Sequence, residues 1–301
     1  MTNWGASPND VWIGSAGGFD KLWYYDGANW APYPYREGPS GFSGDFYSIF
    51  GFAKDDVWMG GGDGEIFHYN GERWELFYRF EKQGYNITLV SDIWGTATSD
   101  IYAVGNAIEN ETSSYKGFLL HYDGEKWEEL LVTDFGAQFQ RVRKGKEGLI
   151  IRGSHRADGE PSTLSFFKYS DHQFKTLLSE TAGEVETLWM NNVGEDIYYI
   201  VGNELKQRRN RAFKTFLSTT ENSTPIGING RHEKDLFIVT ENGVTHYNGQ
   251  DYYTLVNLEN EVSYVFRELV FERDIFFLVN DYGAGTNLIY HGTLTEEEQG
   301  E

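Results

Sequence analysis

Short apolar and aromatic runs alternate with turn residues along the chain, and residues 92–127 show the pattern most completely. This stretch holds four such runs; residues 101–104 are β-branched or aromatic, and residues 118–122 alternate with polar neighbours. The dipeptide Asp123-Gly124 precedes the last run, and it is typical of a tight hairpin with positive φ angles between antiparallel strands. The pattern predicts four antiparallel strands in chain order, called strands a to d.

The same unit recurs along the whole chain. The start of strand b is found at seven places, which are Asp10, Asp56, Asp100, Gly148, Asp196, Asp235 and Asp274. Their spacing runs from 39 residues (196 to 235) to 48 residues (100 to 148), and a propeller blade takes about 40–45 residues. The chain is therefore predicted to be all-β, a single seven-bladed β-propeller domain of four-stranded antiparallel blades over residues 1–301. Six blades are the alternative.

Loop lengths differ between the two ends of this meander. The a–b and c–d turns are short, whereas the b–c and d–a connections hold the long insertions, at residues 34–45, 81–88, 106–116, 153–162 and 202–212. Variable loops on a rigid scaffold commonly carry binding residues. We expect binding on the long-loop face and in the axial funnel, at Tyr35, Arg36, Tyr47, Tyr85, Asp92, Gln138, Arg141 and Glu186. The tyrosines can stack on a sugar or anchor a peptide, and the arginines can pair with carboxylates.

Charge and composition exclude several classes of function. The net charge of −21 argues against nucleic acid, whose phosphates need a basic surface. No apolar run approaches the roughly 20 residues of a membrane span. Without cysteine, neither disulfides nor thiolate metal sites can form. Two basic runs, residues 141–146 and 206–211, are expected to be solvated loops, with an anionic partner as the alternative. We expect a monomer.

The recurrent histidines and aspartates are interpreted as structural. His68, His121 and His246 occupy one position of three different units, so symmetry separates them and a shared metal ion is not expected. The Asp before strand b is expected to accept backbone N–H groups in the a–b turn. No pair of carboxylates shows a catalytic spacing. We therefore assign no catalytic residue, no metal and no cofactor, and favour a protein that is not an enzyme.

The repeat itself is similar to a known one. Tandem units of the form W-G-x(4,5)-D-[VI]-[WY]-x-x-G followed by H-Y-[DN]-G-x-x-W resemble the repeats of bacterial cell-envelope β-propellers, most clearly in units 1 to 3. The resemblance implies a secreted protein or lipoprotein, in the periplasm or at the cell surface, from a family of mostly unassigned function. The Gly-His and Trp-Asp pairs of WD40 repeats are missing.

These observations favour a non-catalytic extracytoplasmic binding or scaffold propeller for a glycan or protein partner. One alternative is a glycan-active hydrolase or lyase that uses carboxylates near the axis. Another is a structural ring in a surface assembly. The sequence alone does not choose the ligand.

The chain begins close to its first strand, at Trp4-Gly5. We expect a targeting segment upstream of Met1 that is absent from this chain. Unit 7 offers only residues 291–297 for its strand d, and an open outer edge leaves backbone groups unpaired. The closing strand is therefore expected to come from the upstream segment, with a short strand at residues 292–295 as the alternative.

Overall fold

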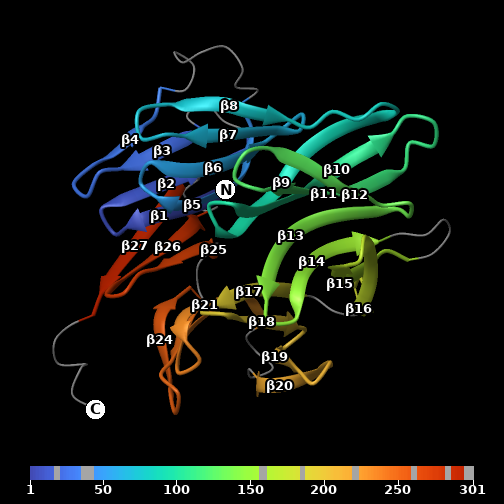
Figure 1. The fold of residues 1–301 in the computed structure, drawn as a ribbon. Coiled ribbons are helices and arrows are strands. Elements are labelled where there is room, and N and C mark those ends of the chain that lie inside the picture. Colours follow the sequence, from blue (N-terminus) through green and yellow to red (C-terminus); the bar gives the residue numbers. More distant parts are fainter. Residues whose placement is uncertain are drawn as a thin grey trace. The chain divides into compact units, whose positions relative to one another are not determined.

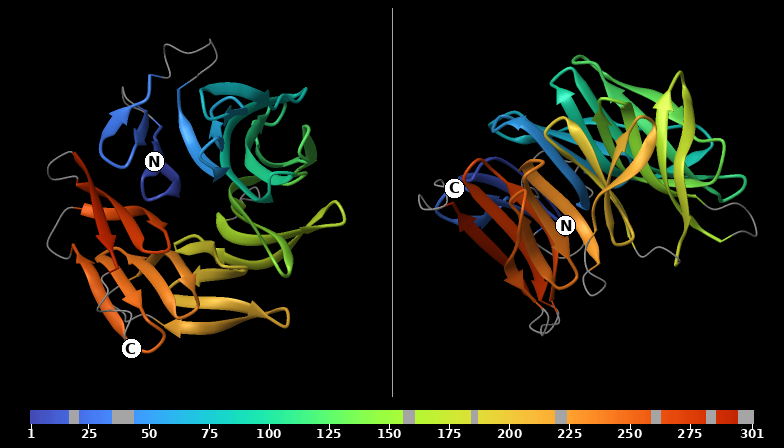
Figure 2. Two further views of the ribbon diagram at one scale, coloured as in Figure 1. Left: turned by 60° about the vertical axis from the view of Figure 1, so that its left-hand side comes forward. Right: turned by 90° about the horizontal axis from the view of Figure 1, so that it is seen from below.

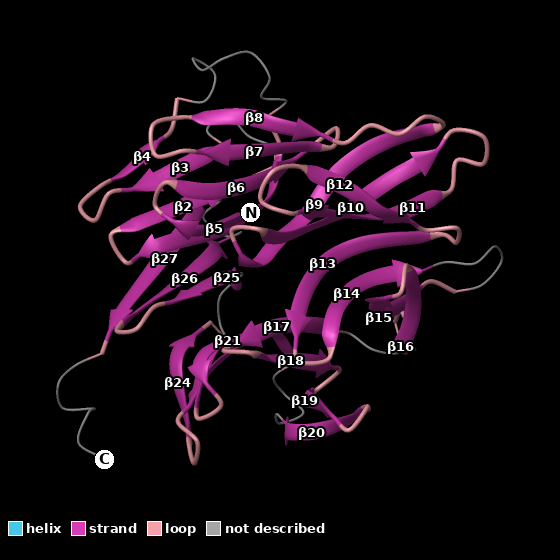
Figure 3. Cartoon of the chain, viewed as in Figure 1, coloured by secondary structure: helices cyan, strands magenta, loops and turns pink. Residues whose placement is uncertain are grey.

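The described residues of the chain are strands, turns and loops, without a helix (Figure 3). A computed structural model describes residues 1–16, 21–34, 44–155, 161–183, 187–218, 224–258, 263–281 and 286–294. Their 27 strands form seven antiparallel sheets, in which the strands are adjacent in chain order. We call these sheets blades 1 to 7. Blades 1 to 4 belong to one compact unit, Met1–Glu184, and blades 5 to 7 to a second, Val185–Glu301.

Each blade of the first unit has four strands (Figures 1 and 2). First strands of neighbouring blades contact one another, so strand a is the inner edge of a blade and strand d the outer edge. The strands are β1 (Thr2–Ser7), β2 (Asp10–Gly14), β3 (Leu22–Tyr25) and β4 (Trp30–Pro32); β5 (Phe46–Ala53), β6 (Asp56–Gly61), β7 (Glu65–Tyr69) and β8 (Trp74–Arg79); β9 (Tyr85–Ala97), β10 (Asp100–Glu109), β11 (Tyr115–Tyr122) and β12 (Trp127–Val132); and β13 (Ala137–Gly145), β14 (Gly148–His155), β15 (Thr163–Ser170) and β16 (Gln173–Thr181).

The second unit repeats this plan, but the described part of blade 7 has three strands. Four-stranded antiparallel blades are thus confirmed in six of the seven sheets. The strands are β17 (Leu188–Val193), β18 (Asp196–Val201), β19 (Glu204–Arg209) and β20 (Ala212–Ser218); β21 (Pro225–His232), β22 (Asp235–Thr240), β23 (Gly243–Tyr247) and β24 (Tyr252–Asn257); and β25 (Ser263–Val270), β26 (Asp274–Asp281) and β27 (Thr286–Thr293).

The c–d turns are built alike in blades 1, 2, 3 and 6. An Asp or Asn side chain accepts two backbone N–H groups, as Asp123 does from Glu125 at 2.8 Å. The next residue, Gly124, takes a φ of +100°, and its carbonyl accepts the hydroxyl of Tyr122 at 3.0 Å. Each turn has four residues instead of the two expected, because the side chain of the Asp or Asn fixes it and only the glycine needs a positive φ.

A histidine on strand c is held by the Asp that begins strand b. The distances from ring Nε2 to carboxylate oxygen are 2.7–3.1 Å at His68, His121, His246 and His291. Each pair lies within one blade, which confirms a structural role for the first three histidines. The turn role expected of the Asp is wrong here, because these carboxylates accept from side chains. Burial acts to raise the pKa of Asp100, but hydrogen bonds from Lys144 and Thr96 outweigh it and lower the pKa to about 2.

Aromatic side chains fill the space between blades 1 and 2 and between blades 2 and 3. The strand-b Trp58 of blade 2 meets Trp127 of blade 3 edge-on, with ring centroids 5.7 Å apart. One blade earlier, Trp12 meets Trp74 in the same way at 5.4 Å. All four rings are buried. A buried Trp removes 150–250 Å² from water, so this repeated contact contributes a large part of the packing between blades.

Side chains on strand a also bind each blade of the first unit to the next. A hydroxyl or carboxylate oxygen of one blade accepts a backbone N–H of the following blade over 2.7–3.0 Å. These bonds run from Ile49 to Thr2, from Ile93 to Ser48, and from Val142 to Asp92. We call this series the inner clasp. At Asp92 the clasp is charged, because the same carboxylate accepts Nη1 of Arg143 at 2.7 Å.

Two segments expected to be loops are strands. Residues 106–116 mostly extend β10 and β11, which pair as far as Ile108 and Tyr115. Residues 202–212 contain all of β19 and a turn at Asn210-Arg211, whose φ angles are +55° and +66°. The basic runs therefore lie mainly on β13 and β19 instead of in loops. Their basic side chains interrupt the apolar alternation that marks a strand in the sequence, so these strands were not expected.

Of the two expectations for the closing strand of unit 7, the structure contradicts the short strand d at residues 292–295. Gly292 and Thr293 pair with β26 as the end of strand c, so they do not form a short strand d. Residues 295–301 lie outside the described part of the chain. An upstream source for the closing strand stays a prediction.

Replacing Trp127 with Ala is expected to lower the free energy of unfolding by about 3–5 kcal/mol, the usual cost of deleting a buried Trp. The exposed neighbour Glu128 gives a matched control, and Glu128→Ala should change it by less than about 0.5 kcal/mol. Urea unfolding measures both. A loss below about 1 kcal/mol for Trp127→Ala would contradict a packing role between blades.

Replacing Asp92 with Ala is expected to destabilise by about 3–5 kcal/mol, because Arg143 would keep a buried charge without its carboxylate. The two side chains are only 13% and 9% exposed. Asp92→Asn keeps an oxygen for the N–H of Val142 and should lose less. Denaturant unfolding of the two variants tests the clasp, and equal, small losses would argue against it.

Candidate functional site

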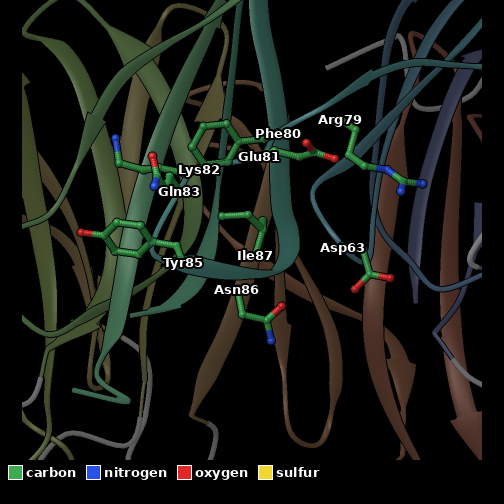
Figure 4. A pocket seen from close by; sticks show the side chains of 9 residues that line it. All are labelled: Asp63, Arg79, Phe80, Glu81, Lys82, Gln83, Tyr85, Asn86 and Ile87. Atoms are coloured by element: carbon green, nitrogen blue, oxygen red, sulfur yellow. The ribbon is translucent and has the colours of Figure 1, made fainter. Parts of the chain in front are cut away.

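A pocket of about 680 Å³ opens in the first unit where blades 2 and 3 meet. It is lined by the b–c turn of blade 2, by the connection from β8 to β9, and by the start of β9. The lining residues are Asp63, Arg79, Phe80, Glu81, Lys82, Gln83, Tyr85, Asn86 and Ile87. Figure 4 shows Tyr85, Lys82 and Gln83 on one side, Asp63 and Arg79 on the other, and Phe80 and Ile87 between them.

The floor of the pocket is fixed by the core. Phe80 and Ile87 are buried in the apolar cluster shared by blades 2 and 3. The N–H of Phe80 donates to the carbonyl of Gly64 at 2.9 Å, and the N–H of Asp63 to that of Thr88 at 3.1 Å. Gly64 has a φ of +75°, and a Cβ there would lie 2.5 Å from the carbonyl oxygen of Phe80. The turn therefore needs glycine at position 64. The two hydrogen bonds hold the connection from β8 to β9, which has no regular secondary structure, and the start of β9 against this turn.

The two cations of the pocket are already paired. Arg79 forms an ion pair with Glu65, whose side chain is 1% exposed, and Lys82 contacts Glu129 at 2.7 Å. By contrast, Asp63, Glu81, Gln83 and Asn86 are exposed, and within the part of the chain that the structure describes their side chains have no hydrogen-bond partner. The unpaired charges of the pocket are thus negative, and its free amides can both donate and accept.

Tyr85 gives the pocket its aromatic wall. Its ring is half-buried, its hydroxyl donates a long hydrogen bond to Glu109 Oε1 at 3.4 Å, and the ammonium of Lys82 lies 6.0 Å from the ring centroid. A ring with one face in contact with the core and its other side toward an open pocket can stack on a planar ligand group. Among the expected binding residues that the structure describes, Tyr85 alone lines this pocket.

The other expected residues are placed elsewhere. Tyr47 lies on β5, and Gln138 and Arg141 lie on β13, all partly buried. Asp92 belongs to the inner clasp, where its two oxygens are bonded to Ser48, Val142 and Arg143. Their binding roles stay predictions. Tyr35, Arg36 and Glu186 lie outside the described residues.

Several pocket residues have no counterpart among the expected ones. Asp63 sits in a glycine-rich stretch that reads as a simple β-turn, and Asn86 and Gln83 are ordinary loop residues by type. The length of the connection at residues 81–88 was the available signal. Which side chains face the pocket depends on the packing of two blades, and residue type alone does not show that.

Metal-binding groups and membrane-spanning helices are both absent from the part of the chain that the structure describes. In residues 1–294, leaving aside the stretches that are not described, no three His, Asp or Glu side chains form a group suited to a metal ion. The described residues also contain no helix that is long and apolar enough to span a membrane.

Comparison with known proteins supports the fold. Protein-family models and curated proteins give no match to the chain. Among solved structures, YCF48 bound to D1 peptide is similar with a TM-score of 0.64 at 15% identity, over 98% of this chain and 93% of that one. YCF48 from Cyanidioschyzon merolae has a TM-score of 0.60 at 15% identity, covering 97% and 95%.

Two further solved structures extend this likeness. The extracellular domain of the hybrid two component system BT4673 from B. thetaiotaomicron has a TM-score of 0.62 at 15% identity, over 98% of this chain and 38% of that one. The WD40 β-propeller domain of Doa1 has a TM-score of 0.57 at 13% identity, over 98% and 93%. At such identities the likeness shows the fold alone. Together with its seven sheets, it establishes the chain as a seven-bladed β-propeller.

Proposed function

We propose that the chain is a non-catalytic binding propeller, and that the pocket between blades 2 and 3 takes a peptide segment of a protein partner. The observation that carries the proposal is the set of unpartnered groups around an aromatic wall: Asp63, Glu81, Gln83 and Asn86 beside Tyr85. Amide and carboxylate groups of this kind suit backbone amides and donor side chains, and a tyrosine suits an apolar or planar side chain.

The charge of the pocket favours a basic peptide. Arg79 and Lys82 are neutralised by Glu65 and Glu129, so Asp63 and Glu81 determine the net sign. The chain as a whole carries −21, which steers cationic partners toward it. A similar propeller, YCF48, was solved with a peptide bound, and this supports a peptide over a glycan.

We further propose that the protein acts outside the cytoplasm. The support is the likeness to the extracellular domain of BT4673 at a TM-score of 0.62, together with the resemblance of the repeat to cell-envelope propellers. Fractionation of cells that produce the natural protein tests this, and recovery in the cytoplasmic fraction would contradict it.

Binding of the purified chain to a peptide array and a glycan array tests the main proposal. We expect binding to peptides with Lys or Arg, weakened about tenfold by Tyr85→Ala, which corresponds to about 1.4 kcal/mol. The melting temperature should fall by less than about 4 °C, because Tyr85 is half-buried.

Tyr115→Ala is the matched control. Tyr115 is 47% exposed and does not line the pocket, so its loss should leave the affinity unchanged. Binding to glycans alone would reject a peptide ligand. A parallel loss of stability and affinity in Tyr85→Ala would show that this residue serves the core.

A further inference from the structure

The two basic runs, which lie mainly on β13 and β19, differ in how their charges are compensated. On β13, Arg143 forms an ion pair with Asp92 at 2.7 Å. Lys144 forms another, with Asp100, at 2.8 Å. The second run belongs to β19 and β20, the two outer strands of blade 5 (Figure 1). Residues 205–218 contain five of the 25 Lys and Arg of the chain and none of its 46 Asp and Glu, so this hairpin is a local basic surface on an acidic chain.

Most of the positive charge at the tip of this hairpin is not neutralised by the chain. Lys206 forms an ion pair with Glu204. Three other cations are exposed and have no carboxylate partner in the part of the chain that the structure describes: Arg209, Arg211 and Lys214. Burial and the positive charge of Arg211 lower the pKa of the neighbouring Arg208. Like charges therefore lie close together at the tip.

The strand register places two of these cations on one face of the hairpin. Lys214 pairs with Gln207, and Arg209 lies two residues further along β19, so the three side chains share a face. Nε of Arg209 donates to Oε1 of Gln207 at 3.0 Å, which restrains the guanidinium. Its two terminal amino groups have no hydrogen-bond partner among the described residues. A guanidinium held in this way can donate two parallel hydrogen bonds to one carboxylate.

The turn of the hairpin holds Arg211 in a conformation that favours glycine. Asn210 and Arg211 have φ angles of +55° and +66°, whereas the c–d turns of blades 1, 2, 3 and 6 place a glycine at positive φ. A side chain strains the backbone in this region. Blade 4 has a similar turn, in which His172 has a φ of +57° and its Nδ1 lies 3.5 Å from the hydroxyl of Tyr169. The side chain of Arg211 makes no such contact within the described residues, so the chain itself does not use it.

We propose that the tip of the β19–β20 hairpin binds an acidic segment of a partner protein. Arg209 donates to one carboxylate of the segment through both terminal amino groups, and Arg211 and Lys214 attract the neighbouring acidic residues. This surface shares no residue with the pocket of blades 2 and 3, and its role does not depend on the ligand of that pocket.

The small extent of the basic surface favours a short acidic segment over a long polyanion. Charges are screened over about 8 Å at physiological ionic strength, so a segment that contacts only the hairpin experiences mainly its positive charge. A nucleic acid would also meet the acidic remainder of a chain whose net charge is −21. A second copy of this chain could supply acidic residues as well, and the oligomeric state distinguishes that case.

A fluorescein-labelled octaglutamate peptide tests the proposal with the full chain, and octaglutamine is the control peptide. We expect saturable binding of octaglutamate by fluorescence anisotropy at low salt, weakened about tenfold in Arg209→Gln because the paired hydrogen bonds are lost. Arg73→Gln removes the same charge at the c–d turn of blade 2, where Arg73 pairs with Glu75, and should leave the affinity unchanged.

A substitution by glycine separates binding from stability. Arg211→Gly removes a cation and relieves the strain of the positive φ, so it should weaken octaglutamate about threefold while the melting temperature stays equal or rises. His172→Gly makes the same backbone change in blade 4 and should leave the affinity unchanged.

Four results would overturn the proposal. Octaglutamate could bind no more tightly than octaglutamine, or Arg209→Gln and Arg73→Gln could weaken it equally. Unaltered affinity in Arg211→Gly would remove the role of the turn. Tighter binding of a single-stranded oligonucleotide than of octaglutamate would reject a protein segment, and a dimer that Arg209→Gln dissociates in sedimentation would identify a second copy of this chain instead.

Discussion

In blades 1, 2 and 5, the aromatic strand-b residue is covered by the blade that follows. A four-stranded sheet has two faces to bury and cannot bury them alone. In blade 2, Trp58 is covered by Tyr122 and Trp127 of blade 3, with ring centroids 4.9 and 5.7 Å away. The same relation joins blades 5 and 6, where Tyr198 and Tyr247 share one apolar cluster. The aromatic contact between blades is thus the constraint behind the recurring Trp and Tyr, and it leaves the loops free to vary.

Between blades 6 and 7, polar contacts add to the aromatic contact of Phe237 and Phe277, whose ring centroids are 6.3 Å apart. At blade 6, Phe237 is approached by the guanidinium of Arg231, 5.4 Å from the ring centroid, which also donates to the carbonyl of Phe271 in blade 7 at 2.7 Å. At the inner strands, Asp92 and Arg143 satisfy each other and the clasp. The unpartnered polar side chains described above, Asp63, Glu81, Gln83 and Asn86, line the pocket.

The sequence predicted the elements whose cause is local or repeated. Strand order and the structural role of His68 follow from residues within one unit of the repeat, and the number of blades follows from how often that unit recurs. The partners of Asp92 could not be predicted from one unit, because Arg143 is 51 residues away and contacts Asp92 only through the packing of two blades. The strand at residues 204–209 was missed since Lys and Arg masked its pairing. Asp63 and Asn86 became site residues only once the two blades that frame the pocket were in place.

Hydrogen–deuterium exchange, with and without a bound basic peptide from the array, tests the central claim most directly. If the pocket takes the peptide, residues 79–87 gain protection in the complex, while the inner strands β5, β9 and β13 keep the slow exchange they have in the free chain. Unchanged exchange at residues 79–87, with protection gained on the inner strands instead, would contradict it.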